Sequence, residues 1–477
     1  PMNVSPPHPD PALLERFARI VGDAHVLRSE TDFVPYVTEP RGLWTGRPAC
    51  VLRPGTTAEV SAILKLAEEV GAAIVPYGGG TGLVGGQIPD SSGTQVVVAL
   101  GRMNRIREVD LESGTVTAEA GIVLQTLQEV AERHDRLFPL SLGSEGTCQI
   151  GGNLSSNAGG TGVLVYGNAR ELCLGVEVVL PGGAVLDDLR KLKKDNTGYD
   201  LKDLFIGAEG TLGIITAAVL KLYPRPKGRE VAWVGLSSPR AALELLVRGS
   251  ELAGTGLTAF ELCIDRSVEF TVRHISGTVA PLPSPHPWYV LLEISSGRSA
   301  EDARDLVERL LGEAVEAGIV QDAVIAQNLA QANAFWKLRE SMSDAQKPEG
   351  GSIKHDISVP VAAIPDFIVE GERAAQRVCP GSRLVCFGHM GDGNLHFNIS
   401  QPVGADKAAF LSLYRQMNDA VHEVVRAFGG SISAEHGIGR LKRDELLATA
   451  PPVGIDLMRR IKRAFDPSGI MNPGKVI

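Results

Sequence analysis

The order of apolar and polar residues predicts a strand, a helix and a second strand near the start of the chain. The apolar run ACVLRP ends at Pro54 and predicts a strand. Thr56 followed by Glu59 predicts the capped start of a helix over AEVSAILKLAEEV, and Gly71 predicts its end. The run AAIVPY then predicts a strand that leads directly into a glycine-rich loop.

The pattern changes after Leu100 and again after the prolines at 224–226. TVTAEAG predicts a strand, IVLQTLQEVAERH an amphipathic helix, and GVEVVLPGGAVLD a hairpin that turns at Pro181-Gly182-Gly183. Later, the strand-like runs EVAWVGL, WYVLLEIS and RLVCFGHM alternate with helical runs such as AEDARDLVERLLGEAVEAG and QNLAQANAFWKLRESM. We therefore predict an α+β fold. It has a first domain over 1–226 with two subdomains that meet near residue 100, a second domain over 227–420 and a C-terminal segment over 421–477.

Composition narrows the class of protein. The chain of 477 residues has a net charge of -9 and no long basic run, which argues against a nucleic-acid partner. No apolar stretch approaches the ~20 residues of a membrane span, and no segment has the pattern of a signal peptide. The six cysteines include no CxxC pair, which is typical of reduced thiols. We therefore expect a cytoplasmic protein.

Two glycine-rich segments indicate close contact between the backbone and a ligand. PYGGGTGLVGGQIP starts at Pro76, and glycine at this density lets backbone N–H groups surround an anion such as a pyrophosphate. PLSLGSEGTCQIGGNLSSNAGG adds two glycine pairs beside Asn153 and Asn157. The first segment alone is also compatible with a glycine-rich surface loop, because it lacks the strand-GxGxxG-helix context of a dinucleotide fold.

A second constellation contains two histidines and a glutamate. FGHMGDGNLHF places His389 and His396 on either side of a turn, and SAEHGIGR supplies Glu435. Two imidazoles and one carboxylate suit a divalent metal that keeps positions open for a substrate. Histidines that only hydrogen-bond to loop backbone would give the same pattern. We expect Asp392 to shape the turn through its side chain rather than to bind the ion.

Four segments together resemble the FAD-binding domain of the vanillyl-alcohol-oxidase-like flavoproteins: PYGGGTGLVGGQIP, GGNLSSNAGG, GTLGIIT and the terminal MNPGK. The resemblance covers nearly the whole chain. It implies a two-subdomain FAD-binding domain, an α+β substrate domain and a C-terminal segment that returns to the flavin. Because the first loop has no histidine, FAD without a covalent link is implied. The cofactor-binding residues implied are Pro76, Gly78, Gly79, Gly80, Thr81, Gly82, Gly85, Pro139, Gly143, Gly151, Gly152, Asn157, Gly160, Glu209, Ile215 and Asn472.

HxGDGNxH followed by EHGIG is similar to the D-2-hydroxy-acid dehydrogenase branch, which includes D-lactate, glycolate and D-2-hydroxyglutarate dehydrogenases. The resemblance implies that His389, His396 and Glu435 bind a divalent metal, usually zinc. Adjacent residues of an extended segment point apart, so His436 is expected to face the substrate as general base. Asn398 points the same way as His396 and is expected to touch the acid. The implied reaction moves a hydride from Cα to flavin N5.

Three further residues bear on the choice of acid. Arg339 and Ser343 are four apart, so on a helix they share a face, and Lys354 follows in a strand-like segment. Two cations and a hydroxyl suit a second carboxylate. The arrangement looks like that of the D-2-hydroxyglutarate dehydrogenases, except that Ser343 stands where a threonine is common. We therefore expect oxidation of D-2-hydroxyglutarate to 2-oxoglutarate.

Other functions stay open at this stage. The same chemistry on D-lactate or glycolate would not need Arg339 and Lys354 to converge. A hydrolase that uses metal-bound water would leave the glycine-rich segments unexplained, and a non-catalytic flavoprotein would leave the histidines unexplained. No iron–sulfur cysteine pattern is present, so an external electron acceptor is expected, such as an electron-transfer flavoprotein or a quinone. The resemblance also implies a homodimer.

Overall fold

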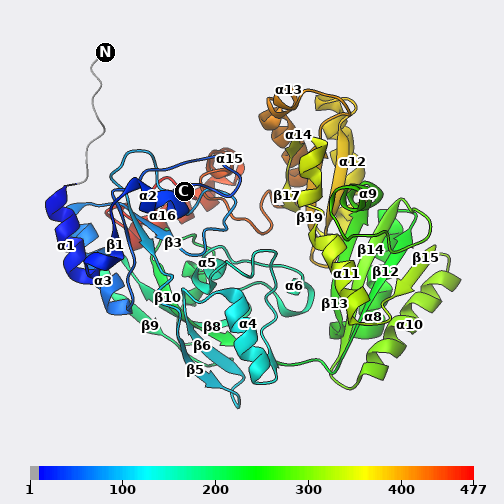
Figure 1. The fold of residues 1–477 in the computed structure, drawn as a ribbon, viewed down its shortest axis with the longest axis horizontal. Helices are drawn as coiled ribbons and strands as arrows, with labels where there is room; N and C mark the ends of the chain where they lie inside the picture. Colours follow the sequence, from blue (N-terminus) through cyan, green and yellow to red (C-terminus); the bar gives the residue numbers. More distant parts are fainter. Residues whose placement is uncertain (1–9) are drawn as a thin grey trace. The chain divides into compact units, whose positions relative to one another are not determined.

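The computed structural model describes residues 10–477, which form two compact units (Figure 1). The chain passes from one unit to the other several times, so each unit is made of separate segments. Unit 1 holds the chain up to Gly159, Gly167–Pro224 and His436–Ile477, and unit 2 holds Gly160–Tyr166 and Arg225–Glu435. Residue 420, where we expected the second domain to end, lies inside helix α14 (Tyr414–Ala427) of unit 2.

Unit 1 begins with a four-stranded sheet. Strands β2 (Cys50–Leu52), β4 (Val96–Ala99) and β3 (Ile74–Tyr77) are parallel, and β1 (Val26–Leu27) pairs antiparallel with β2. Parallel neighbours need a crossover connection, which is helix α3 (Thr57–Val70) here. The helices α1 (Pro11–Val21) and α2 (Glu30–Val37) precede it.

Helix α3 confirms the predicted capping. The Thr56 side chain accepts a hydrogen bond from the Glu59 backbone N–H, and the Glu59 carboxylate accepts one from the Gly55 N–H. The helix ends at Gly71, which has the left-handed conformation with φ 70°. Strand β3 follows at once and delivers the glycine-rich loop at its C-terminal end.

A second sheet of unit 1 is antiparallel. The predicted hairpin is confirmed, because β8 pairs with β9 across the turn Pro181–Gly183. Helix α4 (Leu124–Arg133) also matches its predicted segment. In spatial order the strands are β5 (Ile106–Asp110), β6 (Thr115–Glu119), β10 (Ile214–Lys221), β8 (Cys173–Val179) and β9 (Val185–Asp188). The remaining short elements are β7 (Arg136–Leu137), α5 (Ile150–Ser155), α7 (Lys202–Phe205) and β11 (Tyr223–Pro224).

The C-terminal segment returns to the first sheet of unit 1. After α15 (Arg443–Thr449) and α16 (Pro452–Phe465), the chain runs alongside β3, the last strand of this sheet. The Ile74 N–H donates to the Ile470 carbonyl at 2.8 Å, and the Asn472 N–H donates to the Ile74 carbonyl at 2.7 Å. The last residues therefore brace the strand that carries the glycine-rich loop.

Unit 2 is built on one eight-stranded sheet with helices on both faces. Seven strands run in the order β15 (Asp322–Ile325), β12 (Gly228–Leu236), β14 (Trp288–Ser296), β13 (Leu257–Ile264), β18 (Arg383–His389), β19 (Asn394–Ser400) and β16 (Ser352–Ile353), and β17 (Asp356–Ser358) also pairs with β19. One face packs on α8 (Pro239–Ala253), α10 (Ala300–Glu316) and α12 (Ile364–Val378), and the other on α9 (Asp265–His274) and α11 (Leu329–Glu340). The short helices α6 (Val163–Tyr166) and α13 (Lys407–Leu411) complete the unit.

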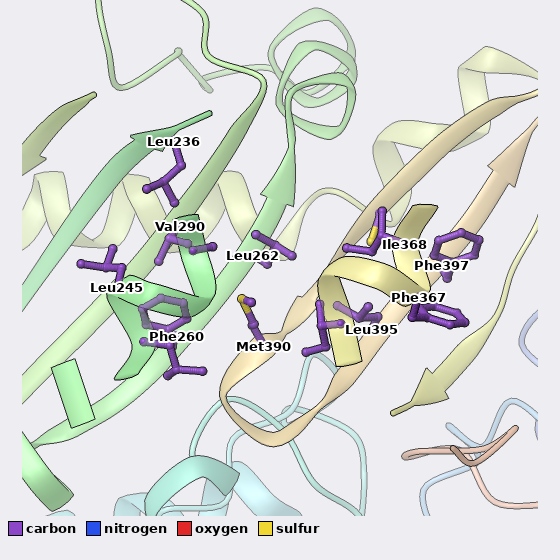
Figure 2. Close-up of a cluster of buried hydrophobic side chains, with 14 of the residues drawn as sticks. Leu236, Leu245, Phe260, Leu262, Val290, Phe367, Ile368, Met390, Leu395 and Phe397 are labelled. Carbon is purple, nitrogen blue, oxygen red and sulfur yellow. The ribbon is translucent and has the colours of Figure 1, made fainter. Parts of the chain in front are cut away.

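The core of unit 2 holds the turn between β18 and β19 in place. Phe367 of α12 packs edge-on against Phe397 of β19, with 5.1 Å between the ring centroids. In Figure 2, the Met390 side chain lies in the same cluster, between Leu262 of β13 and Leu395 of β19. Met390 is fully buried and directly follows His389, so the packed core determines where that histidine starts the turn.

Two observations concern the chain as a whole. All six cysteines are free thiols. In the part from residue 10 onward, every helix is too short or too polar to cross a membrane.

Candidate functional site

A cavity in unit 1 is formed by the glycine-rich loop, helix α5 and the residues before β10. His436, at the start of the C-terminal part of the unit, also lines it. The sequence-predicted cofactor residues that line it are Pro76, Gly78, Gly79, Gly80, Thr81, Gly82, Gly151, Gly152, Glu209 and Ile215. Outside its lining are Gly85, Pro139, Gly143, Asn157 and Asn472, while Gly160 belongs to unit 2. The two glycine-rich segments therefore meet at one cavity.

Glycine is required where the loop crosses other backbone. A Cβ on Gly79 would overlap the Thr147 carbonyl and lie 2.8 Å from Cα of Cys148. A Cβ on Gly151 would lie 2.7 Å from Cβ of Ala120. Both contacts are closer than real side chains make, so the glycines serve the packing of the cavity wall as well as access for a ligand.

Two buried polar atoms of this wall lack a partner. Gln149 and Asn153 line the cavity, and within residues 10–477 their buried atoms Oε1 and Oδ1 accept no hydrogen bond. A buried acceptor without a donor costs about 1–3 kcal/mol, so such atoms mark a site that a ligand completes. A flavin dinucleotide has N–H and hydroxyl donors of the required kind. The sequence pattern drew attention to Asn153 beside the glycine pair, but Gln149 was missed because a lone Gln carries no motif.

Glu209 fixes the loop that follows His436. It has φ 53°, which is rare for a residue with a side chain, and its carboxylate accepts hydrogen bonds from the N–H groups of Ile438 and Gly439 at 3.1 and 2.9 Å. Burial raises the pKa of Glu209 above its usual value. Asn472 braces the same point, since its amide donates to the carbonyls of Glu209 and Gly86.

In unit 2, the three predicted metal ligands converge. His389 ends β18, His396 lies on β19, and Glu435 follows α14 in a loop. Their ligand atoms lie within 4.8 Å of one another. Nε2 of His389 is 3.2 Å from Oε1 of Glu435, and Nε2 of His396 is 3.9 Å from Oε2. Zinc binds histidine nitrogen and carboxylate oxygen at about 2.0–2.2 Å, so one ion fits among these atoms.

Two carboxylates that sequence reasoning missed support this cluster. Oε1 of Glu261 accepts a hydrogen bond from Nδ1 of His389 at 2.7 Å. Oδ2 of Asp356 accepts one from the Glu435 N–H at 2.9 Å, and its other oxygen accepts one from the Asn394 side chain. Such partners orient the ligands of a metal site. The contacts of Glu261 and Asp356 both depend on pairing between segments that are far apart in the sequence. No local motif predicts such pairing.

The pKa values of the two histidines shift in opposite directions. Burial lowers the pKa of His396 to about 4, so at neutral pH its ring is uncharged and can act as a ligand. Burial also opposes charge on His389, but Glu261 and Glu435 outweigh it and raise that pKa well above the usual value. Asp392 accepts a hydrogen bond from the Asn394 N–H and so shapes the turn. Burial raises its pKa to about 6.

The residues predicted to hold a second carboxylate fall into two groups. Helix α11 ends at Glu340, so the prediction that Arg339 and Ser343 share a helical face is wrong. Ser343 instead precedes a 3₁₀ turn and accepts a hydrogen bond on Oγ from Nζ of Lys354 at 3.0 Å. Nε and Nη2 of Arg339 both lie 2.8 Å from Oε2 of Glu261.

Asn398 and His396 both lie on β19, two residues apart. Oδ1 of Asn398 accepts a hydrogen bond from the His355 N–H at 3.2 Å, and the side chain is buried. This contact ties β19 to the segment that carries Lys354.

Comparison with known proteins covers almost the whole chain. Residues 48–188 match the family described as "FAD binding domain", and residues 225–476 match "FAD linked oxidases, C-terminal domain". A D-2-hydroxyglutarate dehydrogenase of Arabidopsis thaliana is 38% identical over 461 residues, 97% of this chain and 80% of that protein. One from Danio rerio is 39% identical over 432 residues, 91% of this chain and 79% of the relative.

Another relative carries a different name. A protein of Schizosaccharomyces pombe named as a D-lactate dehydrogenase is 37% identical over 443 residues, 91% of this chain and 82% of the relative. All three relatives are named as mitochondrial. The expectation of a cytoplasmic protein is therefore wrong, because reduced cysteines do not distinguish the cytoplasm from the interior of an organelle.

Solved structures agree on the fold. An alkyldihydroxyacetonephosphate synthase has a TM-score of 0.75 at 17% identity, covering 99% of this chain and 87% of its own. p-Cresol methylhydroxylase has a TM-score of 0.73 at 16% identity, covering 98% of this chain and 96% of its own. The predicted α+β fold is confirmed. The chain belongs to the vanillyl-alcohol-oxidase-like FAD flavoproteins, in the branch that contains the D-2-hydroxyglutarate dehydrogenases.

Proposed function

We propose that this protein is an FAD- and metal-dependent dehydrogenase that oxidises D-2-hydroxyglutarate to 2-oxoglutarate. The observation that carries the proposal is the convergence of His389, His396 and Glu435 within 4.8 Å, in a chain that continues directly from Glu435 to the cavity-lining His436. The names of the relatives support the choice of acid.

The residues of the unit 1 cavity would hold FAD. The loop Pro76–Gly82 offers backbone N–H groups for the pyrophosphate, and Gln149 and Asn153 offer acceptors for ligand donors. When bound, FAD supplies N5 as the acceptor of the hydride that leaves Cα of the acid. The chain itself contributes binding and orientation.

The cluster in unit 2 would hold a divalent ion, with zinc as the first choice for two imidazoles and a carboxylate. When bound, the ion supplies a Lewis acid that lowers the pKa of the substrate hydroxyl. His436 would take the hydroxyl proton, because an imidazole nitrogen can accept a proton from a substrate hydroxyl. Asn398 lies on the same strand as His396 and contributes a polar contact to the acid.

Arg339, Ser343 and Lys354 would select the second carboxylate. The hydrogen bond between Lys354 and Ser343 pre-orders one cation and one hydroxyl. A charge-assisted contact to the distal carboxylate of D-2-hydroxyglutarate would use this pair, with Arg339 as the second cation.

D-lactate oxidation is the second candidate. Two donors of Arg339 already bind Glu261, which leaves fewer of them for a substrate, and one relative is named as a D-lactate dehydrogenase. The chemistry would be the same, but the second carboxylate would be missing.

Further parts of the proposal concern partners. Electrons would leave to an external acceptor such as an electron-transfer flavoprotein or a quinone, and we propose a homodimer from the family resemblance.

Steady-state kinetics with an artificial electron acceptor test the proposal. Wild-type enzyme is compared on D-2-hydroxyglutarate, D-malate and D-lactate, and 2-oxoglutarate is identified as the product of the first. We expect the highest kcat/KM for D-2-hydroxyglutarate, with D-malate second. A higher kcat/KM for D-lactate would favour the second candidate, and no turnover of any acid would contradict both.

A further inference from the structure

Glu261 contacts the proposed metal ligand His389, but its simultaneous contact with the proposed substrate residue Arg339 has no role in the function proposed so far. Glu261 sits on β13, and only 1% of its surface is exposed. Burying a carboxylate destabilises the folded state unless charged or polar donors surround the carboxylate. The groups that surround this one belong to the proposed metal site and to the proposed substrate site.

Strand register brings Glu261 and His389 together. The two residues are directly opposite each other where β13 pairs with β18. Side chains of directly opposed residues lie on the same face of a sheet. Ala259 and Cys263, which share that face with Glu261, pack in the cluster that includes Phe335 of α11. The carboxylate therefore points to the face covered by α11, where Arg339 lies.

Each oxygen of Glu261 serves a different partner. Oε1 accepts the hydrogen bond from Nδ1 of His389 at 2.7 Å. Oε2 accepts a hydrogen bond from Nε of Arg339 at 2.8 Å, and Nη2 of the same guanidinium lies 2.8 Å from it as an ion pair. Arg339 is itself 7% exposed, and its guanidinium lies over the ring of Phe387. The Arg339 side chain therefore has little room to move. One carboxylate thus bridges a metal ligand and a cation.

The contact to His389 determines which nitrogen is available to a metal. Nδ1 donates its proton to Glu261, so Nε2, which lies 3.2 Å from Glu435, is the nitrogen that can give up its own proton and bind an ion. The contact to Arg339 occupies the edge formed by Nε and Nη2. In residues 10–477, Nη1 makes no hydrogen bond, so this end is the one left for an acid.

We propose that Glu261 is a positioning residue that couples the two sites: it fixes the tautomer of His389 for a divalent ion and orients Arg339 toward the second carboxylate of the substrate. The inference rests on the proposed function for the ion and the substrate. It extends that function, because a single buried side chain then controls both metal affinity and the preference for a diacid.

Glu349 provides a matched control. Like Glu261, it is a largely buried carboxylate of unit 2 that contacts arginine and histidine. Its partners are Nη1 of Arg383 at 2.7 Å, Nε2 of His274 at 2.6 Å and Nη1 of Arg273 at 2.9 Å. It contacts none of the proposed metal or substrate residues. Glu349→Gln therefore removes a comparable ion pair without touching the site.

The first measurement is metal affinity. Zinc is removed from the FAD-loaded protein and its dissociation constant is determined by competition with a chromophoric chelator. Loss of a residue that orients a metal ligand typically costs ~10–100-fold in metal affinity. We expect that loss in Glu261→Gln, with Glu349→Gln close to wild type and FAD content unchanged in both. Equal affinity in the two variants would overturn the inference while leaving the metal site intact.

The second measurement is selectivity at saturating zinc, which removes the effect of weaker metal binding. We expect Glu261→Gln to lower the ratio of kcat/KM for D-2-hydroxyglutarate to that for D-lactate, mainly through KM. An unchanged ratio would overturn the coupling to Arg339. Glu261→Asp keeps the charge but shortens the side chain. If Glu261→Gln does not fold, zinc affinity and the ratio of kcat/KM values are measured on Glu261→Asp instead, with the same expected results. If wild-type protein binds no zinc, the proposed function fails together with the inference.

Discussion

The Nε2 atom of His389 lies 3.2 Å from Oε1 of Glu435, although one residue ends a strand and the other follows a helix. The opposite ring nitrogen of His389 donates to Glu261, so Nε2 faces the Glu435 carboxylate. Zinc bonds to nitrogen and to carboxylate oxygen are each about 2.0–2.2 Å, so a single ion can touch both atoms. The proposed metal site depends on this pair.

Removing a ligand should remove the metal. His389→Ala, His396→Ala and Glu435→Ala should each lower the metal content well below one ion per chain and abolish turnover, because a site with two ligands binds weakly. FAD should stay bound, since its proposed cavity lies in the other unit. Elemental analysis and the flavin absorption spectrum measure both. Full metal content in all three variants would refute the assignment. A chelator should inactivate the wild type, and added zinc should restore it.

FAD should be released when the protein is denatured. The glycine-rich loop contains no histidine to which the flavin is attached in some relatives of this fold. After acid precipitation, the yellow colour should remain in the supernatant, and the mass of the denatured chain should equal that of the polypeptide alone. Cys148 and His436 also line the cavity, so a flavin adduct on either would be detected by peptide mass spectrometry and would contradict the prediction.

Lys354→Met should impair the diacid selectively. The side chain keeps its length but loses the charge that bonds to Ser343 and, in the proposed function, to the distal carboxylate. Loss of a charge-assisted hydrogen bond costs about 1.5–3 kcal/mol, which is about a 10–150-fold drop in kcat/KM. D-lactate turnover should change little. Equal losses on both acids would mean that Lys354 supports the fold rather than the second carboxylate.

Arg339 is a poorer choice for this test. Its removal would leave the Glu261 carboxylate buried without its cation, and breaking a buried ion pair destabilises a protein by about 3–5 kcal/mol. An activity loss in Arg339→Ala would therefore combine unfolding with lost substrate contacts.

The ion pairs of Glu349 predict a pH dependence of stability. Burial alone would raise the pKa of Glu349, but His274, Arg383 and Arg273 lower it to about 2, well below its usual value. A lowered folded-state pKa stabilises the fold above pH 4.5, and this contribution is lost as the pH falls toward 2. Glu349→Gln should therefore lower the thermal midpoint most at neutral pH and least near pH 2. A difference that grows on acidification would contradict this assignment.

Much of the site was predictable because its motifs are local. Paired glycines predict places where backbone segments pack closely. Separately, the glycine turn between His389 and His396 predicts that the two imidazole rings can approach each other. In the pairing of β18 with β19, His396 lies opposite Phe387. Phe387 is two residues before His389 on the same strand, so the two histidines are close together. Local sequence was sufficient for these features, since the chain itself supplies the proximity.

Other features depend on long-range pairing. Glu261 contacts His389 only because the register of β13 and β18 puts the two residues opposite each other. A single Glu within an apolar run of the sequence does not predict this pairing. Met342 continues the apolar spacing of α11 and is fully buried, so periodicity extended the helix past its true end at Glu340. Burial of Met342 arises from the packing of the following turn rather than from helical geometry.

Anaerobic mixing with D-2-hydroxyglutarate tests the central claim most directly. Purified enzyme with bound FAD and zinc is mixed with D-2-hydroxyglutarate, L-2-hydroxyglutarate or D-lactate, and the visible flavin absorption is followed over time. The account predicts that D-2-hydroxyglutarate bleaches the flavin fastest, with one 2-oxoglutarate formed per flavin reduced, and that the zinc-free enzyme reacts far more slowly. Flavin that stays oxidised with D-2-hydroxyglutarate, or is reduced faster by D-lactate, would contradict it.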